Sequence, residues 1–182
     1  MTKRYEVRLS GAGGQGLILA GVILAEAAAI YDGKNALQSQ SYGPEARGGA
    51  SKSEVIISDE EIDYPKATQL DALLALTQEA CHKYYSDLKE DGFLLVDSDF
   101  VTELPPGKFK VYKMPIFTIA SKELGKSMAA NIIALGALVE LSGVVSHEAL
   151  EQAVLARVPK GTEELNRKAL NLGYSHAIMM KR

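Results

Sequence analysis

The sequence has only one cysteine, Cys81, and no tryptophan in 182 residues. A single cysteine excludes a disulfide within the chain, and it excludes a cubane iron–sulfur cluster held by this chain alone, because such a cluster needs about four thiolates. A lone thiol also fits a reducing cytoplasm. The three histidines, His82, His147 and His176, lie in separate segments without the spacing of metal ligands. We therefore expect a cytoplasmic protein and no metal site in this chain.

An excess of positive charge and long uninterrupted apolar runs are lacking too. The chain has 20 Lys and Arg against 23 Asp and Glu, which gives a net charge of −3. A protein that binds nucleic acid needs a basic face, so nucleic acid is not an expected partner. Glu26 and Glu140 interrupt the two longest apolar runs, and residues 1–4 pass directly into a strand pattern. We expect neither a membrane partner nor a secretory leader.

The length and the element pattern predict one domain, residues 1–182, with an α/β fold. A chain of this size buries about 70% of the surface that its unfolded form exposes. Strands are expected at residues 5–9, 34–40, 51–58, 71–77, 93–97 and 110–114, and helices at 17–31, 78–88, 117–124, 127–141, 148–158 and 162–180. Thr77 and Ser146 are the expected N-caps of two of these helices. This alternation predicts a three-layer α/β/α fold with a mostly parallel or mixed sheet.

The first strand has an alternating pattern that is unusual for the centre of a parallel sheet. Tyr5, Val7 and Leu9 face one side, and Glu6 and Arg8 face the other. Central parallel strands are normally apolar on both faces. We therefore expect one face of this strand to contact water or a partner.

A glycine-rich turn, residues 10–16 with the sequence SGAGGQG, follows the first strand and precedes an apolar helix. The order strand, glycine turn, helix is that of a Rossmann-like phosphate-binding unit, because the helix start directs free N–H groups at an anion. Gly11, Gly13 and Gly16 match the dinucleotide pattern G-x-G-x-x-G. We predict a ligand or partner contact at this turn. The alternative, that the glycines only let the helix pack on the strand, stays open.

The chain lacks the acidic residue that a nicotinamide-binding unit carries at the end of its second strand. That strand ends in residues 38–41, QSQS, whereas Asp32 lies before the strand. Arg47 offers a guanidinium that suits a 2′-phosphate, another phosphate or a carboxylate. The missing acid argues against simple binding of NAD.

A second unusual stretch, residues 41–49 with the sequence SYGPEARGG, forms a loop punctuated by glycine and proline. Glu45 and Arg47 lie in this loop, and a solvated pair between them is the simpler alternative to ligand binding. Elsewhere, Asp97 and Asp99 follow a strand, where a turn role is expected, and Asn131 is expected to be a locally satisfied amide. No arrangement of nucleophile and base is present, so no catalytic residue is assigned.

Residues 11–16 together with residues 41–49 resemble the gamma subunit of 2-oxoacid:ferredoxin oxidoreductases, and the resemblance extends over essentially the whole chain. The second motif looks more like the 2-oxoglutarate branch than the pyruvate branch. The resemblance implies a multi-subunit enzyme that decarboxylates a 2-oxoacid on thiamine diphosphate, reduces ferredoxin through iron–sulfur clusters and releases an acyl-CoA. In that family the thiamine and cluster sites belong mainly to other subunits, so this chain alone is expected to be inactive.

The resemblance also implies that the turn and the loop contact a partner subunit or the phosphates of coenzyme A. A stand-alone Rossmann-like nucleotide-binding protein, either a small reductase or a ligand sensor, is the alternative. The expected contact residues are Gly11, Gly13, Gly14, Gln15, Gly16, Ser41, Tyr42, Gly43, Glu45, Arg47 and Gly48.

Overall fold

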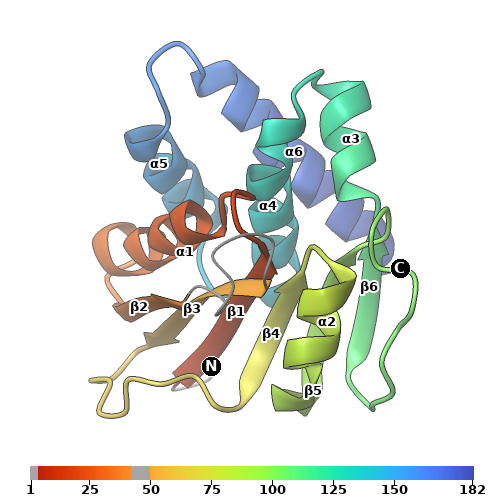
Figure 1. Ribbon diagram of the computed structural model, residues 1–182. Coiled ribbons are helices and arrows are strands. Elements are labelled where there is room, and N and C mark those ends of the chain that lie inside the picture. The colour runs from red at the N-terminus through yellow and green to blue at the C-terminus, as the bar shows by residue number, and fades with distance from the viewer. Residues whose placement is uncertain (1–3, 42–49) are drawn as a thin grey trace.

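The computed structural model describes residues 4–41 and 50–182, and within these residues a mixed sheet lies between two layers of helices (Figure 1). The sheet order is β2-β3-β1-β4-β5-β6. The strands are β1 (Arg4–Ala12), β2 (Asn35–Ser41), β3 (Ala50–Ser58), β4 (Leu70–Ala75), β5 (Leu88–Asp97) and β6 (Lys110–Met114). β1, β4, β5 and β6 run parallel, and β3 runs antiparallel to both β1 and β2. The expected mixed α/β sheet is confirmed.

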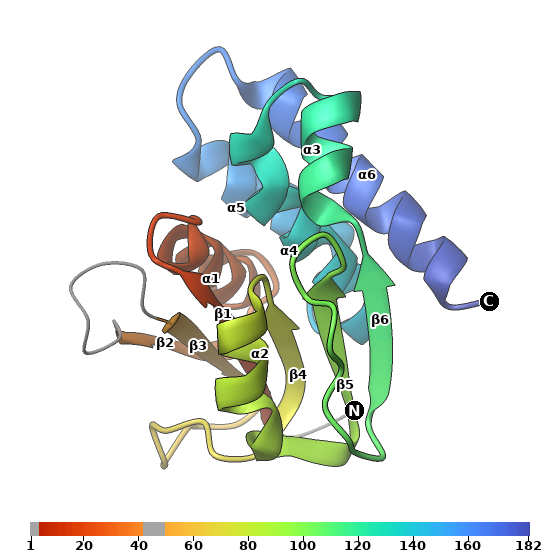
Figure 2. The same ribbon diagram turned by 45° about the vertical axis from the view of Figure 1, so that its right-hand side comes forward.

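Helices cover the two faces of the sheet unequally. The helices are α1 (Leu17–Glu26) with a π-helical turn η1 (Ala27–Tyr31), α2 (Gln78–Tyr84) with a 3-10 turn η2 (Tyr85–Asp87), α3 (Ile116–Glu123), η3 (Ser127–Ala129), α4 (Ala130–Ser142), α5 (His147–Arg157) and α6 (Glu163–Met180). α1, α4, α5 and α6 lie on one face, and α2 lies on the other (Figure 2). The three-layer fold is therefore confirmed. No helix in the described part of the chain is long and apolar enough to cross a membrane.

The larger hydrophobic cluster lies under the four-helix face and is centred on α4. Its residues from Asn131 to Val139 are all buried, because the sheet, α1, α5 and α6 surround this helix. α4 and α6 approach closely at Gly136 and Gly173. A Cβ on Gly173 would collide with the backbone of Ile133. Both glycines are therefore required by the packing of one helix on the other.

The prediction that one face of β1 contacts water or a partner is wrong. Glu6 is 7% exposed and Arg8 is 3% exposed. Arg8 donates to Glu54 at 2.7 Å and to Asp87 at 2.6 Å, and its guanidinium lies 5.1 Å from the ring centroid of Tyr84. α2, η2 and residues 59–69 cover this face of β1, so these charges are buried but paired, as a low-dielectric environment requires.

The helix predicted at residues 78–88 is too long. α2 ends at Tyr84 and η2 at Asp87, and Leu88 already belongs to β5, because pairing with β4 extends this strand. Asp91 and Gly92, a dipeptide typical of turns, lie inside β5, where a Cβ on Gly92 would be 2.8 Å from the carbonyl oxygen of Asp71. The two predicted N-caps are confirmed. Thr77 accepts from the N–H of residue 80, and Ser146 from that of residue 149.

Candidate functional site

The glycine turn and Ser41, the first residue of the second motif, lie at the same end of the sheet. The glycine turn follows the carboxyl end of β1. On one side of β1 the sheet continues with β3 and β2, and on the other side with β4, β5 and β6, so the strand order reverses here. Open α/β sheets bind ligands at such points. Gly11 pairs with Ser51, and Ser41, the last residue of β2, pairs with Lys52 at the same edge. Five of the expected contact residues lie outside the described residues: Tyr42, Gly43, Glu45, Arg47 and Gly48.

The strand–turn–helix order is confirmed, but the glycines are not placed as in a dinucleotide site. In such a site the first glycine makes the tight turn between strand and helix. Here Gly11 still belongs to β1, and α1 begins only after Gly16. Gly14 and Gly16 have φ angles of 85° and 76°, a left-handed conformation that favours glycine. The spacing matches the dinucleotide pattern, yet the turn itself begins at Gly13, two residues after Gly11.

The side chain of Gln15 folds back over the end of β1. Its Oε1 accepts a hydrogen bond from the N–H of Ala12 at 2.6 Å. A Cβ on Gly11 would collide with this same oxygen, so the glycine is required to make room for the Gln15 amide. The Gln15 N–H in turn donates to the carbonyl oxygen of Ala12 at 3.4 Å. Both backbone polar groups of Ala12 are therefore engaged within the turn.

The last glycine of the motif is explained by a residue far away in the sequence. Asn131, on α4, donates from Nδ2 to the carbonyl oxygen of Gly16 at 3.2 Å and accepts from the N–H of Ile132 at 2.9 Å. A Cβ on Gly16 would collide with the Asn131 amide. The expectation of a locally satisfied amide holds for its oxygen, whereas its Nδ2 is satisfied by Gly16, 115 residues away, so Asn131 also fixes the start of α4 beside the start of α1. An amide within the apolar part of a helix was the available signal for this contact.

Backbone donors at the tip of the turn have no acceptor within residues 4–41 and 50–182. They are the N–H groups of Gly13 and Gly14 and of the first turn of α1. Gly13 and Gly14 are exposed, and no atom lies within 4 Å of a Cβ built on either. The first turn of α1 carries no acidic residue. The tip can therefore receive an anion or a partner's carbonyl oxygen, with support from the helix dipole.

Two carboxylates, Asp97 at the end of β5 and Asp99 just after it, lie on the same side of the sheet and bind the start of α3. Asp97 is 3% exposed and accepts from the N–H of Asp99 at 3.0 Å and of Phe117 at 3.2 Å. Burial raises the pKa of Asp97 to about 6, against the lowering effect of these hydrogen bonds. Asp99 accepts from the N–H and from Oγ1 of Thr118. These contacts fasten the start of α3 to the end of β5, in agreement with the structural role expected for both residues.

The remaining titratable side chains do not converge on a site. His147 lies 3.3 Å from Glu140 and stacks on Tyr174, His176 lies near Glu123, and His82 lies near Glu103. Within the described residues, no group of three His, Cys, Asp or Glu side chains is placed to hold a metal ion. Cys81 is buried, and this burial raises the pKa of its thiol to about 11. It is therefore a packed and unreactive thiol.

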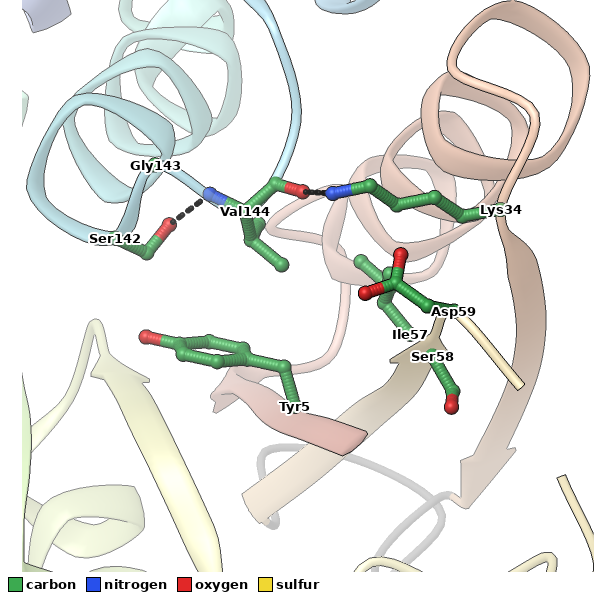
Figure 3. A pocket seen from close by; sticks show the side chains of 8 residues that line it. All are labelled: Tyr5, Lys34, Ile57, Ser58, Asp59, Ser142, Gly143 and Val144. Atoms are coloured by element: carbon green, nitrogen blue, oxygen red, sulfur yellow. Dashed lines mark hydrogen bonds between the residues drawn. The ribbon is translucent and has the colours of Figure 1, made fainter. Parts of the chain in front are cut away.

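A cleft of about 240 Å³ with a mixed polar and apolar lining lies at the other end of β1 (Figure 3). Tyr5, Lys34, Asp59 and Ser142 contribute polar side chains to its lining. Lys34 donates from Nζ to the carbonyl oxygen of Val144 at 2.8 Å, just beyond the C-terminus of α4. A cation is favourable at a helix C-terminus, and this contact joins the start of β2 to the end of α4. Lys34 therefore has a structural role here, at the end of β1 opposite the glycine turn.

Comparisons with known proteins cover nearly the whole chain. The family model described as pyruvate ferredoxin/flavodoxin oxidoreductase matches residues 6–176. The 2-oxoglutarate synthase subunit KorC of Methanocaldococcus jannaschii is 56% identical over 176 residues, which are 96% of this chain and 94% of the relative. The pyruvate synthase subunit PorC of Thermotoga maritima is 31% identical, with 94% of each chain covered. The crystal structure of a keto/oxoacid ferredoxin oxidoreductase gamma subunit from Geobacter sulfurreducens matches with a TM-score of 0.92 and 64% identity, covering 98% of this chain and 99% of that one.

Proposed function

Because the chain belongs to the pyruvate ferredoxin/flavodoxin oxidoreductase family, we propose that it is the gamma subunit of a 2-oxoglutarate:ferredoxin oxidoreductase. One observation carries the choice of substrate. The chain is 56% identical to a 2-oxoglutarate synthase subunit but 31% identical to a pyruvate synthase subunit of similar coverage. The complex would decarboxylate 2-oxoglutarate oxidatively, form the acyl-CoA and reduce ferredoxin in the cytoplasm. Residues 1–182 would act in it as one domain.

The residues of this chain fit some of the complex's cofactors and not others. An iron–sulfur cluster needs about four cysteine thiolates, and Cys81 is single and buried. The clusters are therefore assigned to the partner subunits, and thiamine diphosphate is assigned to them on the ground of the family resemblance alone. The phosphates of coenzyme A fit the free N–H donors at the tip of the glycine turn.

The gamma subunit would complete the surface that closes over the active site of the complex. In this proposal the glycine turn and residues 41–49 together contact a partner subunit or the phosphates of coenzyme A. The free N–H groups of Gly13 and Gly14 and the position of Ser41 at the same edge support this role. No residue of this chain is assigned a catalytic step.

The structure offers little support for a stand-alone nucleotide-binding protein. Asp32, the only acid near the expected offset from the glycines, accepts from the N–H of Ser146 at 2.7 Å and from its hydroxyl at 2.9 Å. Its carboxylate therefore holds the start of α5 and is not free for a ribose. The position of Gly11 inside β1 also differs from the dinucleotide geometry.

The test is purification of the tagged chain from its native host, with its partners identified by mass. We expect thiamine-binding and iron–sulfur subunits to copurify, and the purified complex to reduce viologen with 2-oxoglutarate and coenzyme A faster than with pyruvate. The isolated chain should be colourless and inactive. Faster turnover of pyruvate would refute the substrate, and an iron–sulfur absorbance band in the isolated chain would refute the division of cofactors.

A further inference from the structure

Gln15 occupies the place at the end of β1 where a dinucleotide-binding turn receives its phosphates. In a dinucleotide site the glycines let the pyrophosphate approach the backbone at the strand end. Here the space above Gly11 holds the Gln15 amide, whose Oε1 already accepts from the N–H of Ala12 at 2.6 Å. Residue 11 is therefore a glycine because the Gln15 side chain needs this space, not because a phosphate does.

Gln15 Oε1 and a phosphate oxygen would compete for the same donor. Both are acceptors, so the Ala12 N–H can bond one of them but not both, and the negative end of the amide dipole repels an approaching anion. The space above Gly11 is also narrow, because Leu17 and Leu76 lie beside it, and Asn131 fixes Gly16 at the other end of the turn.

We infer that Gln15 closes the Gly11 position to phosphates and confines any anion contact of the turn to the tip at Gly13 and Gly14 and the first turn of α1. Gln15 is thus a residue that determines which ligands the turn accepts. The inference rests on the proposed anion contact and deepens it. Gln15 disfavours a nucleotide bound in the dinucleotide manner but not a phosphate that approaches the tip from outside.

Backbone amide shifts of the ¹⁵N-labelled chain, titrated with inorganic phosphate and with ADP, test this inference. In the wild type we expect the Gly13 and Gly14 amides to shift while the Ala12 amide stays unchanged. In Gln15→Ala the Ala12 amide should shift as well. Its titration midpoint should lie at a phosphate concentration roughly five- to tenfold below the midpoint of any shift that Ala12 shows in the wild type, which corresponds to one hydrogen bond. Gln152→Ala, which removes an exposed glutamine of α5, is the matched control.

Two outcomes would overturn the inference. One is a shift of the Ala12 amide in the wild type with the same midpoint as in Gln15→Ala, because phosphate would then displace the side chain freely. The other is a folded Gln15→Ala chain whose Ala12 amide stays silent. Gln15→Met keeps the length of the side chain without its acceptor, and it decides the question if Gln15→Ala does not fold. Silent Gly13 and Gly14 amides would count against the proposed anion contact alone, because Ala12 in the variants still reports on Gln15.

Discussion

Replacing Arg8 by methionine tests whether the buried charges of β1 stabilise the fold. The change keeps the length and the apolar stem of the side chain but removes the hydrogen bonds to Glu54, Asp87 and the carbonyl oxygen of Ala67. Removing one partner of a buried ion pair costs roughly 3–5 kcal/mol, because the other charge stays buried without compensation.

The structure places the expected cost near the lower end of this range. The Asp87 side chain is 45% exposed and can be hydrated, and Lys52 Nζ remains 3.6 Å from Glu54, whose side chain is only 11% exposed. We therefore expect Arg8→Met to lower the free energy of unfolding by about 3 kcal/mol. For a chain of this size that corresponds to a fall of roughly 6–12 °C in the melting temperature.

Urea unfolding of three variants measures the effect. Arg8→Met with Glu54→Met should recover part of the loss, because a buried ion pair can often be replaced by apolar side chains at little cost. Arg157→Met is the control: it breaks a pair with Glu26 in which both oxygens are bonded at 2.7 Å but the arginine side chain is half exposed, so its loss should be smaller. A loss in Arg8→Met no greater than in Arg157→Met, or no recovery in the double variant, would refute the reasoning.

Three further predictions concern the helix packing, the sheet edge and the loop. Gly173→Ala should lower the free energy of unfolding by roughly 2 kcal/mol in urea unfolding, because the new methyl group meets the α4 backbone at Ile133; a stabilised variant would contradict this packing. Burial raises the pKa of Asp97 to about 6 from its ordinary value of 3.8, so between these pH values the folded state binds more protons than the unfolded state. The stability of the wild type relative to Asp97→Asn should therefore fall as the pH rises from 4 through 6, and a stability difference independent of pH would contradict this. Arg47→Lys should weaken the assembly or activity of the complex without changing the subunit's melting temperature, whereas wild-type assembly and coenzyme A dependence in Arg47→Ala would make Arg47 an ordinary surface residue.

The parts of the fold that the sequence predicted well depend on local signals. The N-caps at Thr77 and Ser146 are set by hydrogen bonds to residues three positions along the chain, so the sequence contains all the relevant information. The order of strands and helices likewise follows from apolar periodicity within each element. Both features could be predicted because no distant residue decides them.

The predictions that failed depend on distant residues. Glu6 and Arg8 have the alternation of a half-exposed strand, but the groups that neutralise Arg8 lie 46 and 79 residues away. The boundary of α2 shifted because Leu88 pairs with Leu70 in the sheet, and this pairing overrides a local helical pattern. In each case tertiary contacts reversed what local periodicity favoured.

The glycine motif depends on both local and distant contacts, because its glycines are required for different physical reasons. Gly11 makes room for Gln15, four residues away, and Gly16 makes room for Asn131, which is distant in the sequence, so both are required by the protein's own side chains. A Cβ on Gly13 or Gly14 would meet no atom of the described residues within 4 Å. The spacing G-x-G-x-x-G cannot separate these cases, because it records only where a Cβ is absent. What distinguishes them is the group that fills each space, and this leaves the tip of the turn as the part of the motif available for contact with a ligand or a partner.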